Sequence, residues 1–467
     1  MINNLPDNWA AAKLGDVCKT TSGGTPSRKR EDYFQGDIPW VKSGELPDGP
    51  IVEIEEYITE EAVKNSSAKL FPSGSLLVAL YGATVGKLGI LNRDATTNQA
   101  VCAIFPTESL DAKYLFWYLR YVRSDLIAQA IGGAQPNISQ GILRELELPI
   151  APLEQQKRIV AEIEKQFSRL DEAVANLKRV KANLKRYKAA VLKAAVEGKL
   201  TEEWRKRHPD VEPASKLLER ILTERRQKWE ETELANMKFK GKAPKNNKSK
   251  EKYKEPKGPT TDLTNLPAGW VWANLELLKE FSLYGPRFSS TDYSEKGIHV
   301  LRTSDINESG KVNTKTTPKL DLDDIQYEKY KVNKGDLLIT RTGSLGTLAV
   351  YNDDVRAIPG AYLIQYRLAA GHHTSWFLFY FFKSPLGLKQ IIKGGAGVGR
   401  PNLNAPTIED IKTPFPPSAE QKEIIRKIES AFTLTEKLET QIEDNLVRAD
   451  RLRQSILMNA FSGRFVS

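Results

Sequence analysis

The sequence predicts a mixed α/β protein that is built twice. Two repeated α/β domains are separated by two long helices, and the helices form an antiparallel coiled coil that gives the chain pseudo-twofold symmetry. Two observations predict this fold class. A long helical pattern occurs twice without a gap, and the segment before each copy carries the same order of strands, turns and helix. Because such self-similarity indicates a duplicated fold, we expect the 467 residues to hold two copies of one plan.

The two long helical segments are residues 152–200 and 417–467. In the first copy, apolar or small residues recur every three or four positions, and charge interrupts this seam only at Lys181 and Lys188. A helix of about 45 residues is roughly 68 Å long, which exceeds what a globular core requires. Two such helices most economically cover each other as an antiparallel pair. The alternative is that each is an independent surface helix on its own domain.

Each long helix has a recognisable beginning and end. Pro152 and Pro417 precede the two copies, no proline interrupts either one, and Gly198 and Gly463 follow where a left-handed closing residue is needed. These signals predict the domain organisation: an α/β domain, a long helix, a connector, a second α/β domain and a second long helix. The corresponding boundaries are 1–151, 152–200, 201–264, 265–416 and 417–467.

The two α/β segments repeat their own internal order. A Leu-Pro-x-x-Trp opening occurs at 5–9 and again at 266–270. Apolar strands that end in glycine turns and an aromatic-rich core helix follow in both halves. Each half closes with a glycine-rich turn and a Pro-Asn segment, at 132–137 and 397–402. The repeat therefore covers the domains as well as the helices.

The net charge of +10 is concentrated in one run. Between Lys238 and Lys257 there are nine lysines and two glutamates, so the rest of the chain is close to neutral. The run has few apolar residues to bury, which predicts a disordered tether after a connector helix over 214–229; a non-specific contact with phosphates is the alternative. The chain has neither a long apolar run nor a secretory signal, so we expect a cytoplasmic protein without a membrane span.

The sequence lacks the motifs of the catalytic and nucleotide-binding sites that it partly resembles. Gly82–Lys87 lacks the spacing and the Ser or Thr of a phosphate-binding loop, and Gly394–Gly399 misses the dinucleotide pattern. The acid-Pro-Pro-aromatic signature of adenine methyltransferases is absent around Pro416. The four histidines form no constellation with a nucleophile or with cysteines. We expect no catalytic site, no metal and no cofactor in this chain.

The arrangement resembles the specificity (S) subunit of type I restriction-modification enzymes. The resemblance rests on the helix starts Pro152-Leu-Glu-Gln-Gln-Lys-Arg-Ile159 and Pro417-Ser-Ala-Glu-Gln-Lys-Glu-Ile424, on Gly198-Lys-Leu-Thr-Glu-Glu-Trp204 and on the Leu-Pro-x-x-Trp openings. It covers essentially the whole chain. The resemblance implies that each α/β unit is a target recognition domain reading one half of a bipartite, asymmetric DNA sequence, while the helices set the gap.

The resemblance also implies partners. In this family the helices dock two methyltransferase (modification) subunits, which carry S-adenosylmethionine and methylate adenine, and two motor-nuclease (restriction) subunits join later. S-adenosylmethionine, ATP and Mg²⁺ are therefore expected in partner subunits, and double-stranded DNA is the expected ligand of this chain. The alternative is a non-enzymatic interaction scaffold, with duplicated ligand-binding domains on a helical stalk that never touches DNA.

Candidate DNA-binding residues come from polar and basic loops, because base edges and phosphates are bound by Arg, Lys, Asn, Gln, Ser and Thr on exposed loops. A polar turn that hydrogen-bonds its own backbone explains any single one of them equally well. The candidates in the first half are Thr25, Ser27, Arg28, Lys29, Arg30, Lys42, Ser43, Thr84, Lys87, Gln135 and Asn137. Those in the second half are Tyr284, Arg287, Arg302, Thr303, Arg341, Ser344, Arg400 and Asn402.

Overall fold

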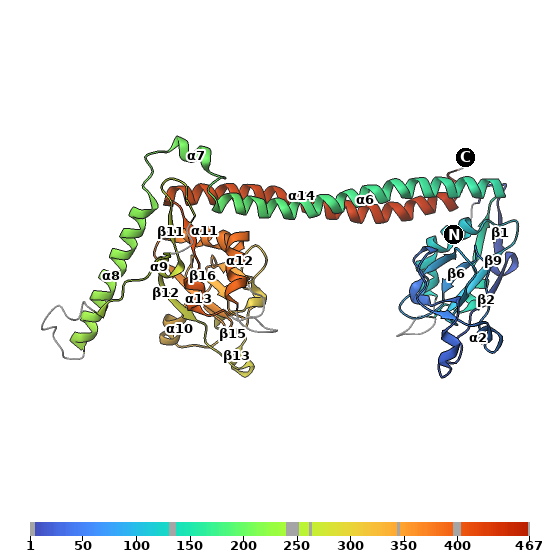
Figure 1. Cartoon of the computed structure of the whole chain (residues 1–467), viewed down its shortest axis with the longest axis horizontal. Coiled ribbons are helices and arrows are strands. Elements are labelled where there is room, and N and C mark those ends of the chain that lie inside the picture. Colours follow the sequence, from blue (N-terminus) through green and yellow to red (C-terminus); the bar gives the residue numbers. More distant parts are fainter. Residues whose placement is uncertain are drawn as a thin grey trace. The chain divides into compact units, whose positions relative to one another are not determined.

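The computed structural model describes residues 5–129, 137–239, 252–260, 264–342, 346–395 and 403–465. The chain forms two compact units, of which the first comprises Met1–Arg179 with Gln441–Ser467 and the second comprises Val180–Thr440. Each unit contains one α/β domain and a part of each long helix (Figure 1). We call residues 5–151 the first domain and residues 265–416 the second domain.

The first domain alternates short strands with short helices. Its strands are β1 (Ala10–Lys13), β2 (Cys18–Ser22), β3 (Ile38–Val41), β4 (Gly49–Ile51), β5 (Tyr57–Ile58), β6 (Leu76–Ala79), β7 (Leu88–Leu91), β8 (Thr96–Thr97), β9 (Val101–Pro106) and β10 (Glu147–Ile150). Its helices are α1 (Leu14–Val17), η1 (Glu31–Phe34), η2 (Ser43–Glu45), α2 (Glu60–Lys64), α3 (Ala112–Tyr121), α4 (Arg123–Ala128) and α5 (Gln140–Arg144). The strands form a central sheet of order β2-β9-β6-β7-β4, a small sheet β5-β3-β8 and the pair β1-β10.

The second domain repeats this order. Its strands are β11 (Val271–Ala273), β12 (Lys279–Tyr284), β13 (Tyr293–Ser294), β14 (Ile298–Leu301), β15 (Lys319–Leu320), β16 (Leu337–Thr340), β17 (Leu348–Val350), β18 (Ala357–Pro359), β19 (Leu363–Leu368) and β20 (Thr413–Phe415). Its helices are α9 (Leu275–Leu278), η4 (Ser290–Asp292), η5 (Thr303–Asp305), α10 (Asp324–Tyr330), α11 (His372–Lys383), α12 (Pro385–Gly394) and α13 (Ala405–Glu409). The central sheet has the order β12-β19-β16-β17, beside a sheet β13-β15-β14-β18 and the pair β11-β20.

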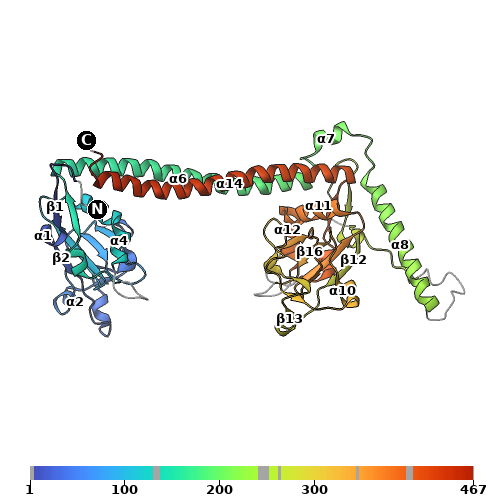
Figure 2. The ribbon, with the colours of Figure 1, turned by 180° about the vertical axis from the view of Figure 1, so that it is seen from behind.

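The two sheet systems correspond except at their edges, where β4 of the first domain and β13 of the second have no counterpart. In each central sheet the long strand β9 or β19 lies between two antiparallel neighbours, β2 and β6 or β12 and β16. In each small sheet one pair is parallel, β3 with β8 and β14 with β18. The aromatic helix α11 packs its phenylalanines against the central sheet of the second domain, and Figure 2 shows it between that sheet and the long helix above it. The duplicated α/β plan is therefore confirmed.

Two helices of 44 residues each, α6 (Leu153–Val196) and α14 (Ser418–Phe461), run through the units. In the second unit the end of α6 shares a core with the start of α14, where Leu192 and Ile428 are buried. In the first unit the start of α6 shares a core with the end of α14, where Ile163 and Ile456 are buried. The helices therefore pair antiparallel in each unit, which confirms the predicted fold class and excludes independent surface helices.

One charged residue in the predicted seam has a partner across it. Lys188 forms an ion pair of 2.7 Å with Glu439 and lies 5.9 Å from the centroid of the Phe432 ring. In the first unit, Arg453 repeats this arrangement by pairing with Asp171 above the Phe167 ring. An ion pair with an aromatic contact keeps a long basic side chain in the seam, because its stem stays on apolar surface. Lys188 interrupts the apolar pattern in the sequence, but in the structure it thus helps to hold the two long helices together.

The repeated plan continues at the helix ends. Gly198 and Gly463 have φ of +71° and +80°, the left-handed conformation that closes a helix and favours glycine. A Cβ on Gly198 would collide with Pro267 of the second Leu-Pro-x-x-Trp opening, and a Cβ on Gly463 would collide with Pro6 of the first. Each long helix therefore ends against the opening of a domain. The residues that follow α14 therefore lie against the first residues of the first domain.

The connector is more ordered than the sequence suggests. It contains α7 (Glu202–Arg207) and α8 (Ala214–Phe239), so the connector helix continues ten residues past the expected end at Trp229. Tertiary contacts hold the first half of α8: Ile221 is buried in the core of the second unit, and Arg225 pairs with Glu276 at 3.0 Å. Part of the expected disordered tether also lies on α8, where Tyr253 packs on Trp229 with ring centroids 5.3 Å apart. Residues 240–251 of the tether lie outside the described residues.

Candidate nucleic-acid interface

The end of the central sheet carries the same backbone platform in both domains. In the second domain, the Arg341 N–H donates to the Tyr362 carbonyl at 3.0 Å, and the Leu403 N–H donates to the Arg341 carbonyl at 2.7 Å. In the first domain, the Leu80 N–H donates to the Ala100 carbonyl at 2.8 Å, and the Ile138 N–H donates to the Leu80 carbonyl at 2.8 Å. These bonds tie the strand end to the segment that follows the glycine-rich turn. Arg341 and Leu80 therefore occupy equivalent positions.

Polar and aromatic side chains gather on the platform of the second domain. The Arg341 guanidinium lies 5.0 Å from the centroid of the Tyr284 ring. The Tyr284 hydroxyl accepts a hydrogen bond of 2.7 Å from the Ala405 N–H, which fixes the ring under the guanidinium. Tyr362 stands opposite Arg341, next to the Thr340–Leu363 pair of the sheet, and is 56% exposed. The result is a surface site with one guanidinium and two accessible aromatic rings.

The first domain fills the same positions differently. Leu80 and Ala100 are both buried at 6% exposure, so the apolar core extends to the end of the sheet. Polar groups stand beside it: the Thr25 hydroxyl donates to the Gln99 side chain, and Asn137 is exposed where it bridges to Tyr81. Hence the two domains present different side chains on one scaffold.

Four of the predicted basic residues are engaged by neighbouring groups. Arg28 pairs with Glu56 at 2.7 Å and stacks on Phe34, Arg30 pairs with Asp32 at 2.6 Å, and Lys42 pairs with Glu55 at 2.9 Å. Arg302 binds both carboxylate oxygens of Asp305, which also accepts the Arg302 backbone N–H and so caps η5. The hydrogen bond from Arg28 holds the pKa of Glu56 below its usual range, and the bond to Asp305 raises the pKa of Arg302. These four basic side chains thus have carboxylate partners within their own domains.

The remaining predicted residues fall into three groups. Ser27, Lys29 and Arg287 are exposed, and within the described residues Lys29 and Arg287 have no ion-pair partner. Ser43, Thr84, Lys87 and Thr303 are half-buried, and the Thr303 hydroxyl is buried without a partner among the described residues. Gln135, Ser344, Arg400 and Asn402 lie outside the described residues.

Two residues of the platform were absent from the predicted set. Gln99 and Tyr362 each lie just before a long central strand, β9 and β19. Tyr362 had a signal, because it is a large aromatic residue at the first position before an apolar run, where the strand leaves the core. No sequence signal marked Gln99, since its side chain is placed by a hydrogen bond from Thr25, which is distant in the sequence.

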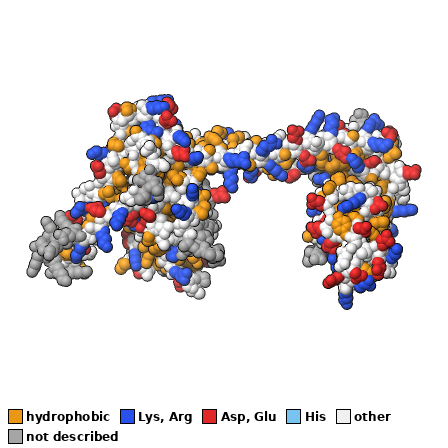
Figure 3. All heavy atoms as spheres, viewed as in Figure 1, with side chains coloured by type: hydrophobic (Ala, Val, Ile, Leu, Met, Phe, Trp, Pro, Cys, Tyr) orange, Lys and Arg blue, Asp and Glu red, His pale blue; other side chains and the backbone are white. Residues whose placement is uncertain are grey.

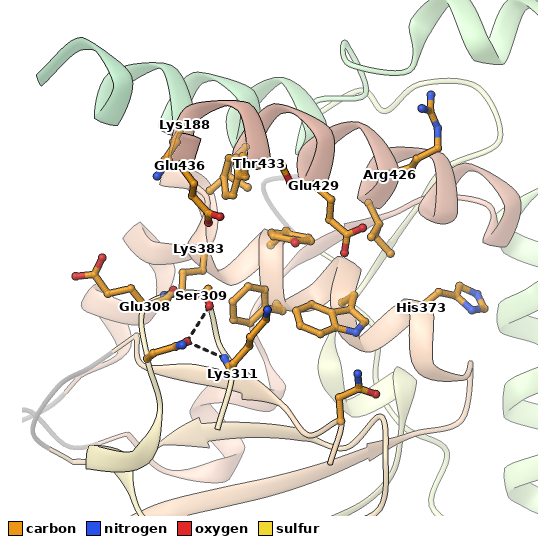
Figure 4. A pocket seen from close by; sticks show the side chains of 18 of the residues that line it. Lys188, Glu308, Ser309, Lys311, His373, Lys383, Arg426, Glu429, Thr433 and Glu436 are labelled. Carbon is orange, nitrogen blue, oxygen red and sulfur yellow. Dashed lines mark hydrogen bonds between the residues drawn. The ribbon is translucent and has the colours of Figure 1, made fainter. Parts of the chain in front are cut away.

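A second concave surface lies in the second unit, where α11 faces the long helices. This groove has a volume of about 1140 Å³ and an aromatic floor that includes Trp376 and Tyr380. Figure 4 shows Lys383 and Lys311 on one wall and Glu429 and Glu436 on the other. Burial lowers the pKa of Lys383, whose ammonium donates to the Glu308 carbonyl at 2.8 Å. Aromatic side chains are enriched at protein–protein interfaces, so the floor of this groove is a candidate docking surface for another protein.

Charge and composition add two general findings. On the face that Figure 3 shows, Lys and Arg are interspersed with Asp and Glu over both domains, so neither presents a broad basic field there. Among the described residues, no three or more His, Cys, Asp and Glu side chains are grouped as metal ligands would be. Within the same ranges, none of the helices combines the length and apolar character that a bilayer crossing requires.

Comparisons with known proteins agree with this geometry. A profile described as "Type I restriction modification DNA specificity domain" matches residues 6–186 and 227–448. The chain is 24% identical over 482 aligned residues to the EcoBI specificity subunit of Escherichia coli, covering 99% of this chain and 88% of that one. It is 31% identical over 182 residues to the MjaIX specificity subunit of Methanocaldococcus jannaschii, covering 38% of this chain and 41% of that one.

Solved structures share the fold. A chain from a study of complex assembly and conformational transition of the type I R-M system superposes with a TM-score of 0.68 at 18% identity, covering 98% of both chains. The HsdS subunit from Thermoanaerobacter tengcongensis superposes with a TM-score of 0.56 at 18% identity, again over 98% of both. Since the family profile matches both halves of the sequence, each with its α/β domain, this chain belongs to the family of type I restriction-modification DNA specificity subunits.

Proposed function

We propose that each α/β domain reads one half of a bipartite, asymmetric DNA target and that the paired helices set the gap between the halves. The observation that carries this proposal is the repeated platform at the end of the central sheet, with the same backbone bonds and different side chains in the two domains. Two readers of one fold with different surfaces suit a target whose halves differ in sequence. The chain itself supplies recognition and leaves catalysis to other subunits.

The proposal includes partner subunits. Two methyltransferase subunits dock on the helices and carry S-adenosylmethionine, and two motor-nuclease subunits use ATP and Mg²⁺. Support comes from the exposed apolar residues on the long helices, such as Leu434, Val447 and Leu452, and from the groove beside α11. Exposed apolar side chains on a helix give a partner protein surface to bury when it docks.

Co-purification with the modification subunit of the host tests the proposal. The complex is expected to contain two modification subunits per chain and to methylate adenines in one bipartite sequence, as mapped by sequencing of modified bases in host DNA. The isolated chain is expected to bind no S-adenosylmethionine and to methylate nothing. A complex that assembles but methylates DNA without a bipartite preference supports the scaffold alternative instead.

The spacing role of the helices has its own test. Inserting four residues after Asn176 in α6 and four after Gln441 in α14 adds about 6 Å of rise and keeps the apolar seam within about 40° of register. Because successive base pairs lie about 3.4 Å apart, the gap between the half-sites should grow by one or two base pairs. The half-site sequences should stay the same.

Two-residue insertions at the same positions are the matched control. They turn the seam by about 200°, so the helices should no longer pair and the complex should not assemble. Methylation at an unaltered gap by the four-residue variant would show that the helices do not set the distance.

A further inference from the structure

The arginines of the second domain divide into two kinds. Five of them are described, and three bind aspartates: Arg302 with Asp305 at 2.8 Å, Arg356 with Asp324 at 2.8 Å and Arg367 with Asp336 at 2.7 Å. Arg341 and Arg287 have no carboxylate partner among the described residues. Arg287 is exposed to water, whereas Arg341 is half-buried. Arg341 is therefore the described arginine of this domain that is partly removed from water without a counter-charge.

The structure holds Arg341 in place from three sides. Its backbone is bonded to Tyr362 and Leu403, its guanidinium lies on the Tyr284 ring, and its Nε is buried with no acceptor among the described residues. Partial burial of an unpaired guanidinium costs free energy, because its donors lose water without gaining partners. A purely structural arginine would be bonded as the other three are. The arrangement instead resembles a donor fork that is pre-ordered for a ligand.

The first domain shows which kind of ligand fits. A phosphate is common to every DNA sequence, so two domains of one fold would keep a phosphate-binding arginine at equivalent positions. The position equivalent to Arg341 is Leu80, which is buried. A base contact, in contrast, must differ between domains that read different half-sites. The replacement of arginine by leucine thus favours a base over a phosphate as the partner of Arg341.

We infer that Arg341, supported by Tyr284 and flanked by Tyr362, selects a guanine in the half-site of the second domain. The guanidinium donates two parallel hydrogen bonds to N7 and O6 in the major groove, the pairing that its planar fork matches best. Tyr284 is a positioning residue, because its hydroxyl is bound to the Ala405 N–H and its ring carries the guanidinium. The inference rests on the proposed function and names one of its specificity determinants.

Methylation of a duplex pool tests the inference. The complex of the full chain with its modification subunit is given duplexes in which every position of the wild-type target is randomised in turn. In Arg341→Leu, which installs the residue of the first domain, discrimination at one G·C pair of one half-site should fall about 10- to 100-fold. All other positions, including the whole half-site of the first domain, should keep their preference. This retained preference also shows that the variant is folded.

Matched variants separate the inference from its alternatives. Arg341→Lys keeps the charge without the fork, so it should lose discrimination at the same pair while binding to other sequences is retained. Arg302→Gln, in which the altered arginine is bound to Asp305, should keep all preferences. Uniform weakening on every duplex by Arg341→Leu, with Arg341→Lys close to the wild type, identifies a phosphate contact and overturns the inference, as does unchanged discrimination. A wild-type complex without a bipartite target contradicts the proposed function, which the variants do not address.

Discussion

The two domains share a backbone at the end of the central sheet and differ in the side chains that stand on it. Where β16 continues into Arg341, β6 continues into Leu80, and two equivalent backbone hydrogen bonds hold each residue. The scaffold therefore fixes where a side chain is presented, while the residue itself is free to vary. Under the proposed function, this separation lets one duplicated fold serve two different half-sites.

The same comparison extends to the beginning of each long helix. In the first unit, Gln155 accepts a hydrogen bond of 3.1 Å from the indole of Trp9. In the second unit, Glu420 occupies the equivalent position. Its carboxylate accepts a hydrogen bond of 2.8 Å from the Trp270 indole, one of 2.6 Å from the Thr201 hydroxyl and a third from Arg205. Glu420 is 1% exposed. The second unit, to which the connector is attached, thus has an ionic cluster at this position, whereas the first unit has a neutral hydrogen bond.

The ionic cluster at Glu420 predicts the largest stability effect. Glu420→Ala leaves the buried end of Arg205 without its carboxylate and should lower the free energy of unfolding of the second unit by about 3–5 kcal/mol. Gln155→Ala removes a neutral acceptor and should cost the first unit about 1–3 kcal/mol. Hydrogen exchange measured by mass spectrometry on the full chain follows the two units separately. If both substitutions lower the free energy of unfolding equally, the distinction between the ionic contacts of Glu420 and the neutral contact of Gln155 is wrong.

Smaller effects are expected at the paired basic residues of η2 and η5. Arg302→Gln removes two bonds to Asp305 and one to the Thr316 carbonyl, and should cost about 1 kcal/mol. Lys42→Gln removes partly exposed bonds to Glu55 and Glu56 and should cost about 0.5 kcal/mol. Urea unfolding measures both, and methylation by the complex should keep its sequence preference. A relaxed preference in either variant would show that the residue leaves its carboxylate to contact DNA.

Most of the fold was predictable because it depends on local signals that occur twice. Repeated prolines, glycines and seam positions predicted the helices, which begin at Leu153 and Ser418 within one residue of the expected starts after Pro152 and Pro417. The extension of α8 to Phe239 was missed; within it Glu233 pairs with Lys252, which lies beyond the lysine-rich run's start in the sequence. The extension is rich in Glu, Leu, Ala, Met and Lys, residue types that favour a helix even where the side chains are exposed.

The candidate site was only partly predictable. Arg302 and Arg341 have the same local pattern, a basic residue at the end of an apolar strand. Asp305 lies three residues from Arg302 and binds it, whereas the surroundings of Arg341 come from Tyr284, at the end of β12, and Tyr362, just before β19. A single sequence shows which side chains are able to bind DNA. It does not show which of them are already bound by neighbouring carboxylates, because that depends on the folded sheet.

Exchange of the first domain tests the central claim most directly. Residues 1–151 are replaced by the equivalent domain of another family member with a known target, and the sequence methylated by the complex is mapped. If the two domains are independent readers on a common scaffold, one half of the target should change to that of the donor, while the other half and the gap stay as in the wild type. A change that spreads over both halves, or a target that does not change at all, would contradict the account.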